Sequence, residues 1–262
     1  MAATTLACSS NPSPGKGDGG GTTGGMVLMP DMNGFMSGTV AGVTGAWYSY
    51  GDSYNTANAN NLGDCQTGGF TAAQCSAATS PAFGAPFANT GGKMCLTGTA
   101  ATTIAPTGST TPAYSAIWGV GIGFDFNNAG VGDAGASAGN GNKLPWNATT
   151  YGITGFKFDI SGVPLGGNLR IEFPFMGQTG NDAPYWGGMA NNLSIPGATG
   201  TSTSDGTYSF KWTDVTGPMY ATSPPAFDPS MIISAQWHVV SNTKGPVTVD
   251  NMCVSNVTLT TD

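Results

Sequence analysis

Two runs of the sequence alternate apolar with polar residues, and the polar ones are Arg170, Glu172, Gln236 and His238. Between them these side chains offer several hydrogen-bond donors and acceptors, in forked and ring geometries. They suit hydrogen bonding to a ligand that carries several polar groups. We therefore treat the four as the first candidates for a binding site.

Ion pairing within a sheet explains two of these residues without any ligand. Arg170 and Glu172 are predicted to share a face with Lys157 and Asp159, and opposite charges on neighbouring strands pair with one another. His238 is the only histidine of the chain. A lone histidine on a strand is more often structural than ligand-binding, so both interpretations stay open.

Catalysis has little support in the residue types. Glycoside cleavage needs two carboxylates about 5 to 9.5 Å apart, and Glu172 is the only glutamate, with Asp125 and Asp159 as candidate partners. A single histidine cannot build a zinc site, and no G-x-S-x-G motif is present for a serine nucleophile. We expect no enzyme, and a glycan-cleaving enzyme that uses Glu172 is the least favoured alternative.

The elements that must position these side chains are β-strands. Apolar residues recur at every second position, which is the period of a half-buried strand. Such runs lie at 117–126, 156–160, 169–175, 208–212, 233–239 and 247–259. Shorter strands are expected at 39–43, 47–50 and 94–100, and helix content should be very low. Nine or ten strands with this patterning predict an all-β, two-sheet antiparallel β-sandwich.

Two details of this sandwich follow from the same periodicity. The runs 156–160 and 169–175 flank a turn at 163–167, which predicts an adjacent antiparallel pair. Trp118, Trp212 and Trp237 occupy the same alternate positions as the predicted core residues of their strands, so we expect all three rings in the core.

Composition favours one exported domain. Of 262 residues only 8% are charged, the net charge is −7, and the few basic residues are scattered, which excludes nucleic acid and anionic membranes as partners. No stretch of about 18 apolar residues exists, so membrane attachment would require a lipid. Residues 1–29 are predicted to be a flexible Gly/Pro/Ser-rich leader or tether, and residues 30–262 a single domain.

The cysteines support an oxidising compartment. Cys65, Cys75, Cys95 and Cys253 form an even set in the folded part. Three pairings are allowed, and we favour Cys65 with Cys75 and Cys95 with Cys253. The fifth, Cys8, follows Leu-Ala as in a bacterial lipoprotein signal, so it is either a lipidation site or a free cysteine in a leader. We expect an extracellular or cell-surface protein, with a bacterial outer-membrane lipoprotein as one form of it.

Several segments stand in a familiar order, at 47–52 (WYSYGD), 118–125 (WGVGIGFD), 151–162, 227–230, 233–239 (ISAQWHV) and 249–257. Together they resemble the galactose-binding-like jelly rolls of bacterial carbohydrate-binding modules, especially the family 11 type and related domains of surface lipoproteins. The resemblance spans residues 35 to 260.

The resemblance implies a ligand that lies across a concave sheet. The matching outward positions are Arg170, Glu172, Gln236 and His238, with Asp125, Lys157 and Asp159 as neighbours. Polar forks of this kind suit sugar hydroxyls, and aromatic rings stack on the apolar faces of pyranoses. The aromatic candidates are Tyr48, Tyr50, Tyr185 and Trp186, the last two in a long loop.

Domains of this type often hold a structural calcium ion near the chain ends. Asp250 matches the acidic position before the last strand, and Asp31 could supply a second oxygen ligand. The predicted function is non-catalytic binding of poly- or oligosaccharide. The alternative is a structural or self-assembling adhesive surface protein, for which low charge and abundant Gly, Asn and Thr are also suitable.

Overall fold

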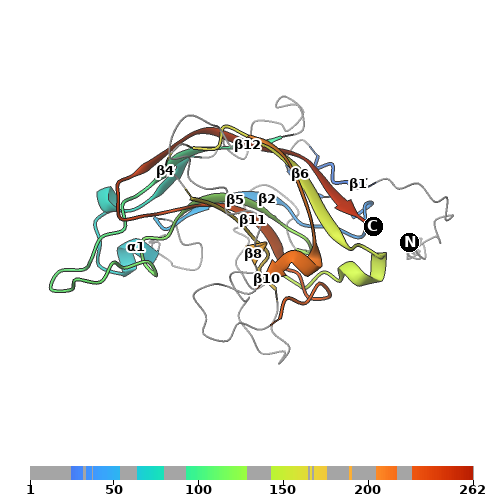
Figure 1. Ribbon diagram of the computed structural model, residues 1–262, viewed down its shortest axis with the longest axis horizontal. Helices are drawn as coiled ribbons and strands as arrows, with labels where there is room; N and C mark the ends of the chain where they lie inside the picture. The colour runs from blue at the N-terminus through green and yellow to red at the C-terminus, as the bar shows by residue number, and fades with distance from the viewer. Residues whose placement is uncertain are drawn as a thin grey trace, which may run out of the picture.

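The computed structural model describes residues 25–31, 34–36, 38–53, 64–79, 93–128, 143–164, 166, 168–175, 189–190, 205–216 and 226–261. Within these ranges the chain is almost entirely β, with two antiparallel six-stranded sheets. Figure 1 shows the sheets stacked as two layers, with β12 and β6 in one and β5, β2 and β11 in the other. The predicted two-sheet sandwich is confirmed.

The first sheet has the strand order β3-β4-β12-β6-β9, and β1 also pairs with β12. Its strands are β1 (Met26–Val27), β3 (Ala77–Thr79), β4 (Met94–Ala100), β6 (Gly155–Ser161), β9 (Gly206–Lys211) and β12 (Val247–Thr260). The long β12 is central, because β4 and β6 both pair along it.

The second sheet has the strand order β10-β8-β7-β11-β5-β2. Its strands are β2 (Trp47–Gly51), β5 (Gly119–Asp125), β7 (Asn168–Glu172), β8 (Met189–Ala190), β10 (Val215–Thr216) and β11 (Ser234–Val240). Short helical segments connect the strands at α1 (Asp64–Thr67), η1 (Ala72–Gln74), η4 (Ala148–Tyr151) and η5 (Trp212–Asp214). No helix in the described ranges is long and apolar enough to cross a membrane.

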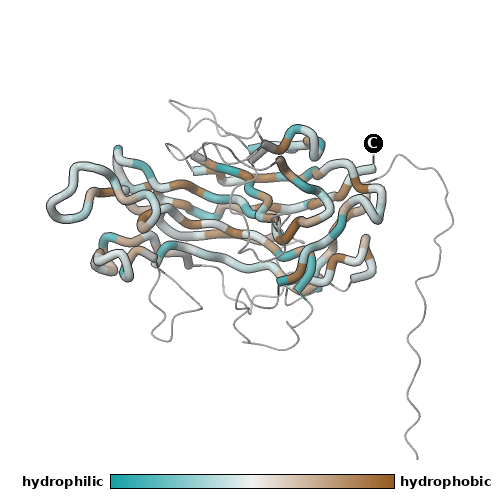
Figure 2. Tube along the Cα trace, turned by 90° about the horizontal axis from the view of Figure 1, so that it is seen from below, coloured by the Kyte–Doolittle hydropathy of each residue, from teal (hydrophilic) through white to brown (hydrophobic). Residues whose placement is uncertain are grey.

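The core lies between the two layers and consists of the alternating apolar side chains of both. Trp237 of β11 is fully buried, and its ring lies 5.2 Å from that of Phe158 in the first sheet and 5.6 Å from that of Trp47. Figure 2 shows hydrophobic and hydrophilic residues alternating along the strands. Trp212 is also buried in this core, as expected.

One predicted strand pair is wrong. β6 and β7 belong to different sheets, because β6 pairs with β12 and β9 whereas β7 pairs with β11 and β8. Both strands send their apolar side chains into the same core, so alternation alone cannot tell a hairpin from a crossing between layers. The expected strand at 39–43 is also wrong, since turns occupy most of that segment.

This crossing separates two sets of charges that were predicted to share a face. Lys157 and Asp159 lie on the outer side of the first sheet, so they cannot pair with Arg170 and Glu172 of the second. Asp159 instead accepts hydrogen bonds from Thr207 (2.6 Å) and Asn256 (2.5 Å).

Both predicted disulfides are confirmed, Cys65–Cys75 and Cys95–Cys253. The second joins β4 to β12 across 158 positions of sequence and therefore restricts the unfolded chain strongly. The predicted boundary after residue 29 is too late, because Met26 and Val27 already pair with β12. Cys8 lies outside the described residues.

Candidate functional site

The strand register brings the predicted polar residues together on the outer face of the second sheet. One row across the sheet joins Tyr48, Gly123, Gln236 and Glu172, and the next joins Tyr50, Gly121, His238 and Arg170. Both layers bend in the same direction, so this face lies on the inside of the bend (Figure 1). We call it the aromatic face.

Several polar side chains of the aromatic face are less exposed than their predicted outward positions suggest. Asp125, Gln236 and His238 are only 1%, 3% and 7% exposed, whereas the tyrosines, Arg170 and Glu172 are half-buried. Aromatic rings lie against these polar groups, and the Tyr48 hydroxyl accepts a hydrogen bond from Gln236 (2.8 Å). A ligand would therefore meet rings and the edges of Arg170 and Glu172 first.

Glycines in the central strand β5 allow the rings to lie this close. A Cβ atom at Gly121 would fall 2.4 Å from the ring and hydroxyl of Tyr50. A Cβ atom at Gly123 would fall 2.7 Å from the Ala235 carbonyl oxygen and 3.2 Å from the Tyr48 hydroxyl. The outward positions 121 and 123 of β5 are glycines, and the tyrosine rings pack directly on the backbone there.

Trp118 belongs to this face rather than to the core, so its predicted place is wrong. Its side chain is half-buried, and its ring lies 5.7 Å from Tyr50 and 5.4 Å from His238. Parity fails here because Gly119 has a φ of +133°, which interrupts the alternation between Trp118 and Val120. The aromatic face therefore has three neighbouring rings, from Tyr48, Tyr50 and Trp118.

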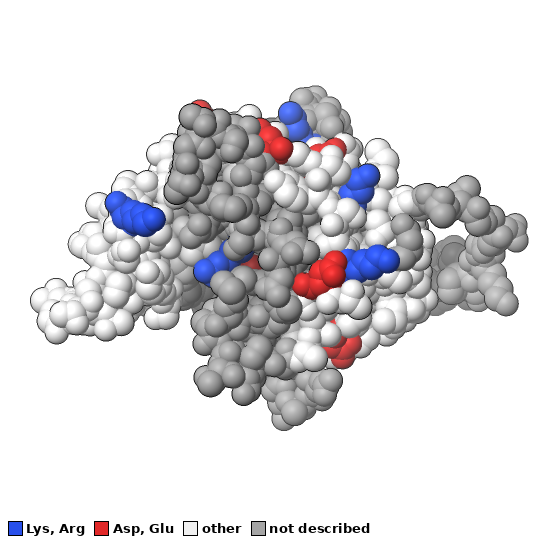
Figure 3. All heavy atoms as spheres, viewed as in Figure 1, with Lys and Arg blue, Asp and Glu red and all other residues white. Residues whose placement is uncertain are grey.

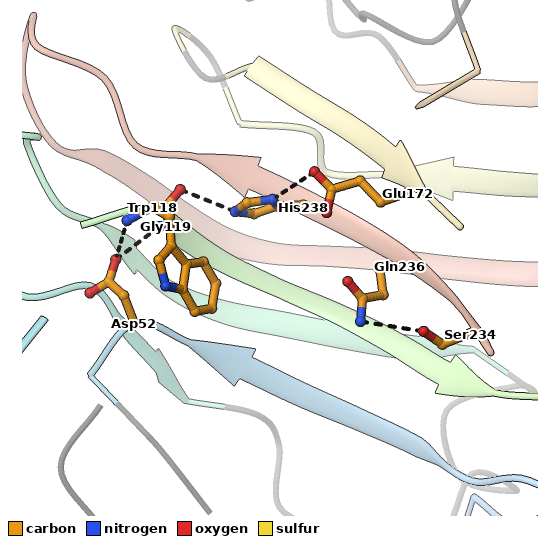
Figure 4. A network of polar contacts seen from close by, with 7 residues as sticks. All are labelled: Asp52, Trp118, Gly119, Glu172, Ser234, Gln236 and His238. Atoms are coloured by element: carbon orange, nitrogen blue, oxygen red, sulfur yellow. Dashed lines mark hydrogen bonds and ion pairs between the residues drawn. The ribbon is translucent and has the colours of Figure 1, made fainter. Parts of the chain in front are cut away.

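His238 stands at the centre of a polar network (Figure 4). Its Nδ1 lies 3.1 Å from Glu172 Oε1, and its Nε2 lies 3.1 Å from the Trp118 carbonyl oxygen. A carbonyl only accepts, and an ionised carboxylate only accepts, so protons on both ring nitrogens satisfy both contacts. Burial raises the pKa of Glu172, but the charge and hydrogen bond of His238 outweigh it and hold that pKa below its usual value.

Lys143 and Asp125 form a buried ion pair beside Tyr48 on the aromatic face. Their Nζ and Oδ1 atoms lie 2.9 Å apart, with side chains 8% and 2% exposed. Lys143 also lies 4.5 Å above the centre of the Tyr48 ring, a cation–π distance. Burial raises the pKa of Asp125, and the nearby ammonium group counters part of that rise. Lys143 and Asn128 already contact the two oxygens of Asp125, and its role in ligand binding stays a prediction.

Sequence reasoning missed Asp52, which is fully buried at the end of β2. Its carboxylate accepts three backbone hydrogen bonds, from Ser76 (2.6 Å), Trp118 (2.9 Å) and Gly119 (2.8 Å). Burial raises the pKa of Asp52, and these hydrogen bonds counter part of that rise. The available signal was an isolated aspartate directly after an aromatic strand, inside the segment 47–52.

The two predicted calcium ligands do not lie at one place. Asp31 Oδ1 accepts from the Phe35 amide beside β1, whereas Asp250 is exposed where β12 pairs with β4. The segment before Asp31 pairs with β12 at Val257, seven positions along that strand from Asp250. Among the described residues one group of three metal-ligating types comes together, Asp52 with Cys65 and Cys75, and a disulfide removes both sulfurs as ligands. Calcium binding stays a prediction.

Two further aromatic candidates, Tyr185 and Trp186, lie outside the described residues. Charged side chains on the side of the molecule seen in Figure 3 are few and scattered, without a single basic patch. The candidate site is therefore defined by rings and by buried, mutually paired polar groups.

The sequence matches no protein-family model and none of the curated proteins. Among solved structures, the fold resembles the carbohydrate-binding module CtCBM11, known from its solution structure, dynamics and binding studies. The match covers 88% of this chain and 95% of that one, at 13% sequence identity and a TM-score of 0.33. The two-sheet sandwich is established by the strand pairing described above.

Proposed function

We propose that the aromatic face binds carbohydrate without cleaving it, as poly- or oligosaccharide outside the cell. The observation that carries the proposal is the run of three half-buried rings, Tyr48, Tyr50 and Trp118, with centroids 5.9 and 5.7 Å apart. Aromatic surface with a few fixed polar groups is the usual composition of a small-molecule site. The rings suit the apolar faces of sugars, and Arg170 and Glu172 suit their hydroxyls.

The polar groups beneath the rings support binding by a preformed surface. Gln236, His238 and Asp125 are each held by a partner within the protein. A ring that rests on fixed neighbours loses little conformational freedom when a ligand binds, which favours affinity.

The electrostatics of Glu172 favour binding over cleavage. A glycosidase acid needs a pKa raised toward neutrality so that it carries a proton, whereas His238 and Arg170 keep the pKa of Glu172 below its usual value. The other carboxylate of the face, Asp125, is paired with Lys143. Burial raises the pKa of Asp125, but its two oxygens already contact Lys143 and Asn128, so it is not free to deliver a proton as a general acid does.

The two disulfides support an oxidising, extracellular location as part of the proposal.

The test is titration of the folded protein with a panel of neutral and acidic polysaccharides and their oligosaccharides. We expect saturable binding to at least one of them, and at least about tenfold weaker binding by Trp118→Ala. Tyr151→Ala is the matched control, because Tyr151 is an exposed aromatic residue on η4 and not on this sheet. It should bind as the wild type does.

Failure of every glycan to bind the folded wild-type protein would overturn the proposal. If the same preparation formed ordered polymers in size-exclusion chromatography and electron microscopy, the self-assembling surface protein would replace it.

A further inference from the structure

The position of Trp118 depends on an irregular piece of backbone at the start of β5. Val120, Ile122 and Phe124 face the core at alternate positions, and a regular strand would place residue 118 on the same side. Instead the Trp118 ring lies beside Tyr50 and His238 on the aromatic face. The residue between Trp118 and Val120 is Gly119, with a φ of +133° that residues with a side chain rarely adopt.

A single carboxylate oxygen holds this irregularity from one side. The amides of Trp118 and Gly119 both donate to Asp52 Oδ2, at 2.9 and 2.8 Å. In a regular strand successive amides point in opposite directions, so two consecutive amides on one oxygen show that the backbone twists away from regular strand geometry between Trp118 and Gly119.

The opposite side of this irregular backbone is held by β11. The Trp118 carbonyl oxygen accepts from the Ser241 amide (2.9 Å) and lies 3.1 Å from His238 Nε2. A Cβ atom at Gly119 would fall 2.1 Å from the Val239 carbonyl oxygen, so the glycine also lets the two backbones approach. Figure 4 shows Asp52, Trp118 and His238 as one continuous chain of contacts.

The chemistry of position 52 requires a carboxylate. Three amides converge on it, with Ser76 on Oδ1 and both Trp118 and Gly119 on Oδ2. An asparagine offers one accepting oxygen and a donating NH₂ group, so at least one amide would face a donor and remain unsatisfied.

We propose that Asp52 is the positioning residue of the aromatic face. By holding the backbone of Trp118 and Gly119, Asp52 directs the Trp118 ring outward and thereby sets the affinity for carbohydrate. The affinity part rests on the proposed function, and the position of the ring does not.

The experiment compares wild-type protein with Asp52→Ala, which removes both accepting oxygens, in two readouts. In the absence of ligand, nuclear Overhauser contacts between the Trp118 indole and the Tyr50 ring should be present in the wild type and lost in the variant. With the best glycan of the panel, the variant should bind at least about tenfold more weakly. Retained ring contacts and unchanged affinity in folded Asp52→Ala would overturn the proposal.

Two controls separate positioning from general damage. Asp159→Ala replaces an aspartate that also accepts two side-chain hydrogen bonds, but on the first sheet, and should leave both readouts unchanged. Leu259→Ala removes a buried core side chain of β12; it should lower the melting temperature while keeping the Trp118–Tyr50 contacts.

A measurement on the wild type alone covers the case in which Asp52→Ala does not fold. The Trp118 and Gly119 amides should exchange with solvent far more slowly than the amide of Gly108 in its exposed turn. Equal exchange would overturn the proposal. If no glycan binds, the proposed function fails, and the ring contacts and amide exchange still decide what Asp52 does.

Discussion

The polar residues on the outer faces of the two sheets differ in burial and in their hydrogen-bond partners. On the first sheet Lys157 and Asn256 are exposed, and Asp159 contacts only near neighbours such as Thr207. On the second sheet Gln236 and His238 are buried beneath aromatic rings and are tied to other strands. On both sheets the outward residues alternate with residues that face the same core. The difference in burial of the polar side chains therefore does not come from the strand pattern.

What differs is the reach of each polar contact. On the first sheet a lost hydrogen bond returns its group to water, which replaces it. On the aromatic face the group that loses its hydrogen-bond partner remains buried and unsatisfied. The loss therefore also destabilises the ring or strand that this group contacts. Matched substitutions on the two faces should therefore differ most where burial differs most.

The largest contrast is expected between two lysines. Lys143→Ala leaves Asp125 buried without its cation and should lower the free energy of unfolding by about 3 kcal/mol. Lys157→Ala removes an exposed lysine of β6 and should change it by no more than about 0.5 kcal/mol. Urea unfolding of both variants measures the difference, and equal effects would remove the distinction between the faces.

The next contrast concerns two carboxylates. Glu172→Gln weakens the contact with His238 and should lower the free energy of unfolding by about 1.5 to 3 kcal/mol. Asp159→Asn, on the outer side of β6, should lower it by about 0.5 kcal/mol or less. Thermal and urea unfolding at neutral pH compare them. A larger loss for Asp159→Asn would show that burial is not what separates the two sheets.

The loss of stability at acid pH should depend on the Glu172 carboxylate. The folded-state pKa of Glu172 lies below its usual value, so its contribution to stability is complete above about pH 4.3 and is lost as the pH falls through the lower folded pKa. Glu172→Gln should therefore flatten the acid side of the stability curve. Asp159→Asn should flatten it less, because Asp159, whose pKa is also lowered, is nearer to solvent. Unfolding midpoints measured across this pH range decide between these outcomes.

The smallest effect is expected in the alkaline titration of the tyrosines. Burial raises the pKa of Tyr50 well above its usual value, and the charge of Glu172 raises it further. Tyr50→Phe should remove a late-ionising step from the ultraviolet titration curve. Loss of an early step instead would mean that the ring is open to solvent and that the aromatic face is not packed as described.

The sandwich and most of its strands could be predicted because alternation is a local property. Met94–Ala100 and the glycine-bearing β5 were both apparent from period-two patterning. The assignment of strands to sheets could not be predicted in the same way, since β6 and β7 present apolar faces to one core from opposite layers. This is why Lys157 and Asp159 were expected beside Arg170.

The candidate site was predictable as a set of residues but not as a surface. Alternation predicted outward positions for Gln236 and His238, and Tyr48 and Tyr50 were aromatic candidates for the same site; the register places all four on one face. Their burial depends on rings lying across glycines, and the outward position of Trp118 depends on irregular backbone at Gly119 that Asp52 holds. Neither the ring orientation nor this backbone has a local sequence signature.

The most direct test of the account follows backbone amide shifts while labelled wild-type protein is titrated with the best glycan of the panel. The account predicts that the largest changes cluster on the aromatic face, at Tyr48, Tyr50, Trp118, Arg170 and Glu172, and that Lys157 and Asp159 do not move. Largest changes on the outer face of the first sheet, or no changes with any glycan, would contradict it.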